Sequence, residues 1–162
     1  MKIAFAVSVT ALSLLAGCAS TSVTPVSRNQ FIISTSAAPA CGRSGAMKVA
    51  SKMAAVETLR RGYPRFLIGG AQSENNVSVI QRAPTYANTS GTYNAYGNTV
   101  YGNSTTTFGG GGPMLIGSND AGLMVLMLKP GDQGYQQALD AKQELGADWE
   151  KLVKDGVKTC TD

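Results

Sequence analysis

The chain has 162 residues, with 14 lysines and arginines against 10 aspartates and glutamates and no histidine, so its formal net charge is +4. This mild charge, without any run of five basic residues, argues against a nucleic-acid partner. Because histidine is a frequent general base and metal ligand, its absence argues against a metal site, and we expect no cofactor. The length suits one domain.

The first segment of the chain has the pattern of a secretion signal. Lys2 precedes an uncharged, mostly apolar stretch at residues 3–16. A helix of that length rises only about 20 Å, which is too short to cross a hydrocarbon core of about 30 Å. We therefore interpret residues 1–17 as a signal peptide. The sequence LAGC at residues 15–18, which spans the end of this peptide, resembles the bacterial lipobox. In that motif the cysteine thiol accepts a diacylglycerol and the peptide before the cysteine is removed.

This resemblance implies that Cys18 is a lipidation site and that the protein is attached to a membrane by an N-terminal lipid anchor. The alternative is an ordinary signal peptide with a chance cysteine near its cleavage site. Anchoring by two or more acyl chains is stable, since each buried methylene contributes about 0.8 kcal/mol. Ala19 follows in place of the aspartate of inner-membrane retention signals, which implies sorting to the bacterial outer membrane, facing the periplasm or the cell surface.

The two other cysteines, Cys41 and Cys160, fit an exported protein, because disulfide bonds form in oxidising compartments. With Cys18 assigned to lipid, we expect these two to form a disulfide bond. The bond would close a loop of more than 100 residues, for which chain-entropy models give about 4–5 kcal/mol. The alternative is a pair of unrelated free thiols.

The segment at residues 18–29 is rich in Ser, Thr, Val and Pro and is typical of a flexible tether. Residues 31–33 then predict a first strand. A long helix follows, for which we expect Ser44 as the N-terminal cap and Gly62 as the terminating residue. Apolar residues at spacings of three and four define one face of this helix: Ala46, Val49, Ala50, Met53 and Val56.

The rest of the chain predicts further strands and shorter helices. The strands are expected at residues 66–68, 77–80 and 123–128, with a turn at 74–76, and the helical segments at residues 135–145 and 149–153. Residues 30–162 therefore predict a single domain of the α+β class. Its small, mainly antiparallel sheet has about four strands and is covered by one long helix and one or two shorter helices.

An uncharged loop is expected at residues 83–119, where Gly, Asn, Thr, Ser and Tyr dominate and a short YGN repeat occurs. Two interpretations remain open. Its few apolar side chains favour a flexible or loosely hairpinned connection between two strands. Its tyrosines, on an adaptable backbone, favour a binding loop for an envelope protein or a glycan. The tyrosines are Tyr86, Tyr93, Tyr96 and Tyr101.

The acidic residues do not form a pattern typical of catalysis. They are scattered along the chain, and Glu74 and Asp120 are expected in turns. No spacing brings two carboxylates into one apolar pocket, as general acid and base chemistry requires. We therefore expect no catalytic residues and no enzymatic activity.

Three short motifs are similar to those of a family of small proteobacterial outer-membrane lipoproteins of unknown function. They are TLRRGYPRFLI at residues 58–68, MLKP at 127–130 and ALDAK at 138–142. The chain departs from the family pattern at Leu139, at Lys142 and in its C-terminal tail. The resemblance implies no catalytic residues.

From these patterns we expect a membrane-anchored envelope lipoprotein with a non-catalytic interaction or structural role. The alternative is a small-ligand or glycan-binding module that uses the tyrosine-rich loop. A more distant alternative is an accessory protein of a hydrolase.

Overall fold

The computed structural model of the protein describes residues 18–161, so the predicted signal peptide at residues 1–17 lies outside the described residues. The chain divides into two units. Unit 1 contains the described residues up to Asn76 and from Gly117 onward, and unit 2 is Val77–Ile116. The strands of the inserted segment pair with one another and not with the strands of unit 1.

Unit 1 contains a five-stranded sheet in which all neighbouring strands are antiparallel. With its helices it confirms the α+β class. In spatial order the strands are β1 (Ala19–Ser27), β2 (Gln30–Ala37), β8 (Asn119–Leu128), β3 (Arg65–Asn75) and β9 (Leu139–Asp140).

Strand β1 occupies the segment that was expected to be a flexible tether at residues 18–29. It pairs with β2 along its length, from Ala19 opposite Ala37 to Ser27 opposite Gln30. The prediction is wrong because alternate small side chains of β1 point toward the helix-covered face: Val23 packs against the core, and the Thr21 hydroxyl lies 2.9 Å from that of Thr35. Together with the backbone pairing, these contacts fix the segment as an edge strand.

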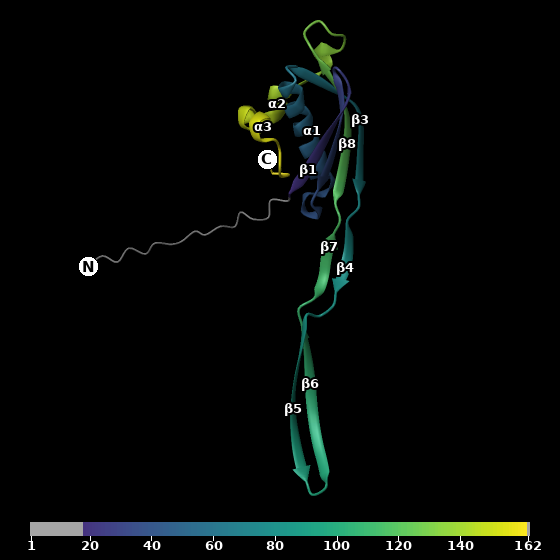
Figure 1. Cartoon of the computed structure of the whole chain (residues 1–162), viewed down its shortest axis with the longest axis vertical. Coiled ribbons are helices and arrows are strands. Elements are labelled where there is room, and N and C mark those ends of the chain that lie inside the picture. Colours follow the sequence, from purple (N-terminus) through teal and green to yellow (C-terminus); the bar gives the residue numbers. More distant parts are fainter. Residues whose placement is uncertain (1–17, 162) are drawn as a thin grey trace, which may run out of the picture. The chain divides into compact units, whose positions relative to one another are not determined.

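Helix α1 (Gly42–Arg60) lies against one face of this sheet (Figure 1). It follows directly from a 3₁₀ turn, η1 (Pro39–Cys41), so it begins two residues before Ser44 and Ser44 is not its cap. The predicted end of the helix is confirmed. Gly62 has a φ of 77°, a backbone conformation that glycine adopts at low cost at the end of a helix.

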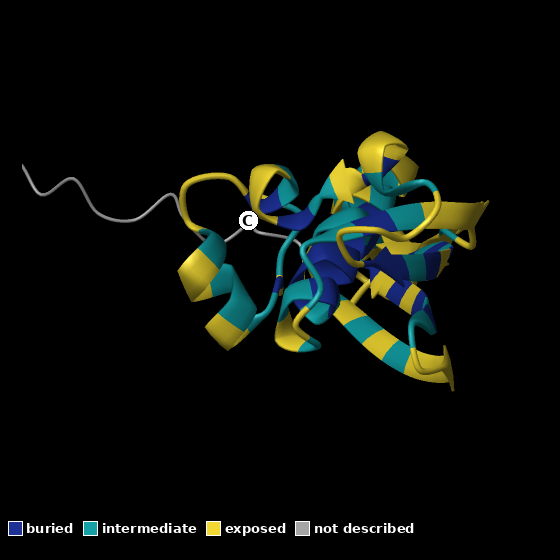
Figure 2. Cartoon of the chain, turned by 90° about the horizontal axis from the view of Figure 1, so that it is seen from above, coloured by how far each residue is buried: buried dark blue, intermediate teal, exposed yellow. Residues whose placement is uncertain are grey.

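The hydrophobic core lies between α1 and the sheet, where Figure 2 shows most of the buried residues together. Alternate residues of β2 and β8 point into it, as expected for strands with one covered face. The largest buried side chains are Phe31 and Ile33 of β2, Leu123, Val125 and Met127 of β8, Phe66 of β3, and Val49 and Val56 of α1.

The C-terminal part differs from the helix predicted at residues 135–145. It consists of a 3₁₀ turn, η2 (Tyr135–Gln137), then β9, then α2 (Ala141–Leu145). Asp140 separates the last two, because its carboxylate accepts hydrogen bonds from the backbone N–H groups of Lys142 and Gln143 at 3.0 and 3.1 Å and so caps α2. The short helix predicted at residues 149–153 is confirmed as α3 (Trp149–Asp155).

Unit 2 contains two ladders of two strands each. The first pairs β4 (Ser78–Arg82) with β7 (Gly112–Ile116), and the second pairs β5 (Tyr86–Tyr96) with β6 (Thr99–Gly109). The strand predicted at residues 77–80 therefore exists, but its partner is β7. The turn predicted at 74–76 is wrong, since β3 continues through Asn75.

Of the two forms of connection expected at residues 83–119, the structure contains the hairpinned one, because most of this segment is in strands. Eleven successive residue pairs join β5 to β6, and a two-residue turn, Gly97–Asn98, connects them. Gly97 has a φ of 61°, which suits the tight turns of β-hairpins. We call β5, this turn and β6 the tyrosine hairpin.

Candidate functional site

Cys18, the predicted lipidation site, is exposed, carries a thiol outside any disulfide bond, and directly precedes β1. Its backbone is nevertheless fixed. Cys18 forms a β-bridge with Thr159, and its carbonyl accepts a hydrogen bond from the N–H of Ala38 at 3.0 Å. The N–H of Ala19 donates to the carbonyl of Lys158 at 2.8 Å. The sequence did not reveal this link to the C-terminal tail, because a single β-bridge has no periodic pattern.

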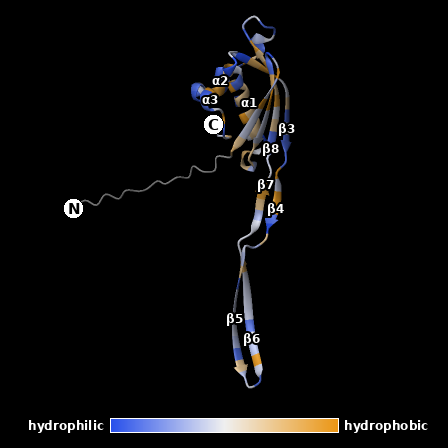
Figure 3. Ribbon diagram, viewed as in Figure 1, coloured by the Kyte–Doolittle hydropathy of each residue, from blue (hydrophilic) through white to orange (hydrophobic). Residues whose placement is uncertain are grey.

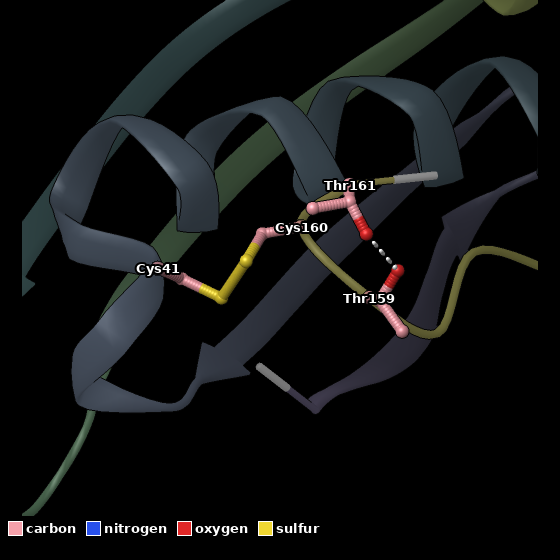
Figure 4. The surroundings of a disulfide bond; sticks show 4 residues. All are labelled: Cys41, Thr159, Cys160 and Thr161. Atoms are coloured by element: carbon pink, nitrogen blue, oxygen red, sulfur yellow. Dashed lines mark hydrogen bonds between the residues drawn. A yellow bond between two sulfur atoms is a disulfide. The ribbon is translucent and has the colours of Figure 1, made fainter. Parts of the chain in front are cut away.

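The disulfide bond predicted between Cys41 and Cys160 is confirmed, with a Cα–Cα distance of 5.8 Å and a sequence separation of 119 residues (Figure 4). It joins the start of α1 to the C-terminal tail, one residue after Thr159. Gly45 provides the necessary space, since a Cβ atom there would lie 3.0 Å from the Cβ of Cys41 and 3.2 Å from that of Cys160.

These contacts bring three chain segments together around Cys18: the start of β1, the start of α1 and the C-terminal tail. The disulfide bond fixes the tail to α1, and the tail pairs with the residue that precedes β1. The predicted attachment point, Cys18, is therefore held in unit 1 next to the Cys41–Cys160 disulfide bond. Within residues 18–161, no helix has both the length and the hydrophobicity needed to cross a membrane.

The four tyrosines of the predicted binding loop do not form one cluster. Successive strand residues point to opposite faces, so the register places Tyr86, Tyr96 and Tyr101 on one face of the tyrosine hairpin and Tyr93 on the other. All four are exposed, and Tyr96 is 86% exposed. Tyr96 and Tyr101 are diagonal neighbours next to the turn, whereas Tyr86 is at the opposite end of the ladder.

Two of these rings cover glycines on the facing strand. A Cβ atom at Gly102 would overlap the ring of Tyr93, and one at Gly109 would overlap the ring of Tyr86. Both glycines are the direct cross-strand partners of the tyrosines that cover them. Aromatic side chains that cover glycine in this way help to fix strand register. Tyr86 and Tyr93 therefore support the hairpin itself, a role that sequence reasoning missed.

A second candidate site is a shallow hollow of about 400 Å³ on the face of the unit 1 sheet opposite α1. Glu74 and Asp120, which were expected in turns, lie here as cross-strand partners on β3 and β8. The other side chains at the hollow are mainly hydroxyls and an amide, and not the apolar groups that raise the pKa of a catalytic acid. They include Ser20, Ser22, Ser34, Ser36 and Gln72.

The pKa of Asp120 is lowered from its ordinary value of 3.8 by hydrogen bonds to its carboxylate from Ser36, Asn76 and Ser118. The amide of Asn76 donates at 2.6 Å and the hydroxyl of Ser118 at 3.0 Å. Asp120 is therefore ionised at neutral pH and accepts hydrogen bonds that join β8 to its neighbours. Among residues 18–161, no group of three side chains that could hold a metal ion is found.

Replacing Asp120 with asparagine should reduce the acid sensitivity of unit 1. A carboxylate whose pKa is lower in the folded than in the unfolded state stabilises the fold. This stabilisation is complete at a pH above the unfolded-state pKa, and it is lost as the pH falls through the folded-state pKa. Wild type should therefore lose more stability than Asp120→Asn between about pH 5 and pH 2. Urea unfolding at several pH values measures this difference, and Asp155→Asn is the matched control at an exposed carboxylate on α3. Parallel pH profiles for wild type and Asp120→Asn would contradict the assignment.

Comparison with known protein families, with curated proteins and with solved structures finds no match for this chain. The resemblance to small proteobacterial lipoproteins consequently stays a prediction from three short motifs.

Proposed function

We propose that this protein is a bacterial envelope lipoprotein, anchored in the outer membrane by acyl chains on Cys18, with a non-catalytic interaction role. The exposed Cys18 thiol, which directly precedes strand β1, carries the proposal. A thiol at this position is accessible for acylation. Strand β1 begins at Ala19, directly after the residue where the lipobox motif places the new amino terminus.

The position of Cys18 also predicts how unit 1 meets the membrane. Because β1 begins at Ala19 and Cys18 pairs with Thr159, the acyl chains would leave the protein directly from its folded surface. Two or more chains of this kind give stable attachment. The part of the unit 1 surface that contains Cys18, Thr159 and the Cys41–Cys160 bond would then lie at the lipid head groups.

Two further observations support an interaction role. The tyrosine hairpin exposes its side chains on both faces, and the open face of the unit 1 sheet presents hydroxyl and amide groups around ionised Asp120. A second candidate function, glycan binding, is favoured by Tyr96 and Tyr101, which are 86% and 68% exposed and lie diagonally on one face. Such amphipathic rings can contact a sugar while their hydroxyls bond to its polar groups.

Metabolic labelling with an alkyne-bearing fatty acid tests the anchor. Wild-type protein should take up the label and fractionate with the outer membrane on a density gradient. The Cys18→Ser variant should lose the label completely, because it has no thiol to acylate.

The matched control is Cys41→Ser, which also removes one cysteine but should keep the label. The Cys18→Ser variant should still contain the Cys41–Cys160 bond, which shows that it was exported and folded. Unlabelled wild-type protein, or equal labelling of Cys18→Ser, would refute the proposal.

A further inference from the structure

The tyrosine hairpin is a long strand pair that no other part of residues 18–161 extends into a larger sheet. β5 and β6 pair only with each other within these residues. Every residue of β5 is exposed, and so is every residue of β6 except Gly109, which is half-buried. Figure 3 shows most of both strands in pale colours, which mark intermediate hydropathy. An isolated two-stranded hairpin of this kind is only marginally stable in water.

Both outer edges of the hairpin are unprotected. In an antiparallel pair, roughly half of the backbone N–H and C=O groups of each strand point away from the partner. Natural edge strands usually carry lysines, inward charges or prolines that prevent a further strand from pairing. Residues 83–119 contain no charged residue, and their two prolines, Pro84 and Pro113, lie outside β5 and β6.

The side chains also favour addition of another strand. Residues 105–107 are three consecutive threonines, a residue type enriched in strands. Across the pair, the hydroxyls of Thr89 and Thr106 lie 2.8 Å apart. On the same face as these threonines, Tyr93, Val100 and Phe108 are 68%, 65% and 66% exposed. This face therefore presents apolar rings and a branched side chain that remain uncovered in one copy of the chain.

We propose that the tyrosine hairpin pairs edge to edge with the tyrosine hairpin of a second copy of this chain. A second copy is a suitable partner because two uncharged hairpins do not repel one another. A strongly charged partner would instead find no opposite charge on residues 83–119. Pairing would satisfy the outward backbone groups of one strand in each copy and extend two strands to four. The proposal specifies the partner for the interaction role proposed above, and it does not depend on the lipid.

Sedimentation velocity of residues 18–162 with Cys18→Ser, exported behind a signal peptide that is cleaved without lipid, tests this pairing without the anchor or the leader. We expect dimers or larger assemblies that dissociate on dilution. Two double variants add lysines to one strand each: Asn88→Lys with Thr92→Lys on β5, and Asn103→Lys with Thr107→Lys on β6. The variant on the strand that forms the contact should weaken association roughly tenfold or more, since lysines of two copies would then lie close together.

The matched control is Gln133→Lys with Gln137→Lys, which adds the same charge to exposed positions of unit 1 and should leave association unchanged. A second control carries glutamates in place of the lysines on the contact strand. The lysine variant alone and the glutamate variant alone should each fail to associate, but a mixture of the two should associate because their charges are opposite. Restoration on mixing also shows that the hairpins of both variants are folded.

A Cys18→Ser protein that remains monomeric at every concentration would overturn the proposal. So would assemblies that persist in both lysine variants. Binding of the monomer to added polysaccharide, abolished by Tyr96→Ala, would assign the hairpin to glycan recognition instead. Since Cys18→Ser cannot be acylated, none of these results affects the anchoring proposal, and failure of the fatty-acid label would leave the pairing result intact.

Discussion

Replacing both Cys41 and Cys160 with serine should lower the free energy of unfolding by about 5 kcal/mol. The bond links residues 119 positions apart, so its loss gives the unfolded chain much more conformational freedom. The folded state also loses the link that holds the C-terminal tail on α1. Val157, which is 5% exposed and belongs to the core, and Thr159, which pairs with Cys18, both lie in this tail.

Urea unfolding of the Cys18→Ser protein, with and without this double substitution, measures the loss. Reductant should destabilise the protein with the intact bond by a similar amount and should have no effect on the double variant. This comparison separates the effect of the bond from that of the serine side chains. Equal unfolding midpoints for the oxidised and reduced protein would show that the bond contributes nothing to stability.

The substitution Phe66→Ala should reduce the stability of unit 1 by about 3–5 kcal/mol. Phe66 is completely buried and lies on β3 opposite Met127 of β8 and Leu139 of β9. Its removal would leave a cavity between the sheet and α1 that neighbouring side chains cannot fill without moving. The loss of buried apolar surface and the cavity both favour unfolding.

The same chemical change at Phe108 is the matched control. Phe108 is 66% exposed on β6, so Phe108→Ala should change stability by no more than about 0.5 kcal/mol. Thermal unfolding of dilute Cys18→Ser protein, followed by near-ultraviolet circular dichroism, measures both variants. A loss at Phe66 no larger than that at Phe108 would contradict the position of the core.

The parts of the fold that the sequence predicts are those with a strong local pattern. Helix α1 has buried residues at spacings of three and four, and Gly62 marks its end. The central strands β2 and β8 contain the apolar side chains of the core. The pairing of Cys41 with Cys160 follows from the cysteine count and the expected oxidising compartment, with Cys18 expected to carry lipid. In each case a few residues specify the structure without reference to distant neighbours.

The missed elements depend on partners that are distant in sequence. Strand β1 has the polar composition of a linker, and its pairing with β2 decides its conformation. Residues 135–145 contain helix-forming residues, but Asp140 caps α2 and the N–H of Ala141 donates to the carbonyl of Pro64 at 3.0 Å. Tertiary contacts therefore override local propensity in this segment.

For the tyrosine hairpin the sequence left a flexible and a hairpinned connection open, since its strands do not alternate apolar and polar residues. Its stability comes from cross-strand partners such as Tyr93 and Gly102. The available signal was the Gly97–Asn98 pair between two segments rich in Thr and Tyr, a two-residue sequence typical of hairpin turns.

Strand β1 has a consequence for the partners that this protein can reach. A disordered linker of the length of residues 18–29 would let the attached body explore a radius of about 20 Å from its anchor. In this protein residues 19–27 form strand β1 of the sheet, so the lipid proposed on Cys18 would reduce this radius nearly to zero. A partner of unit 1 would then have to come to the bilayer surface, either by diffusion in the membrane plane or by extending to that height.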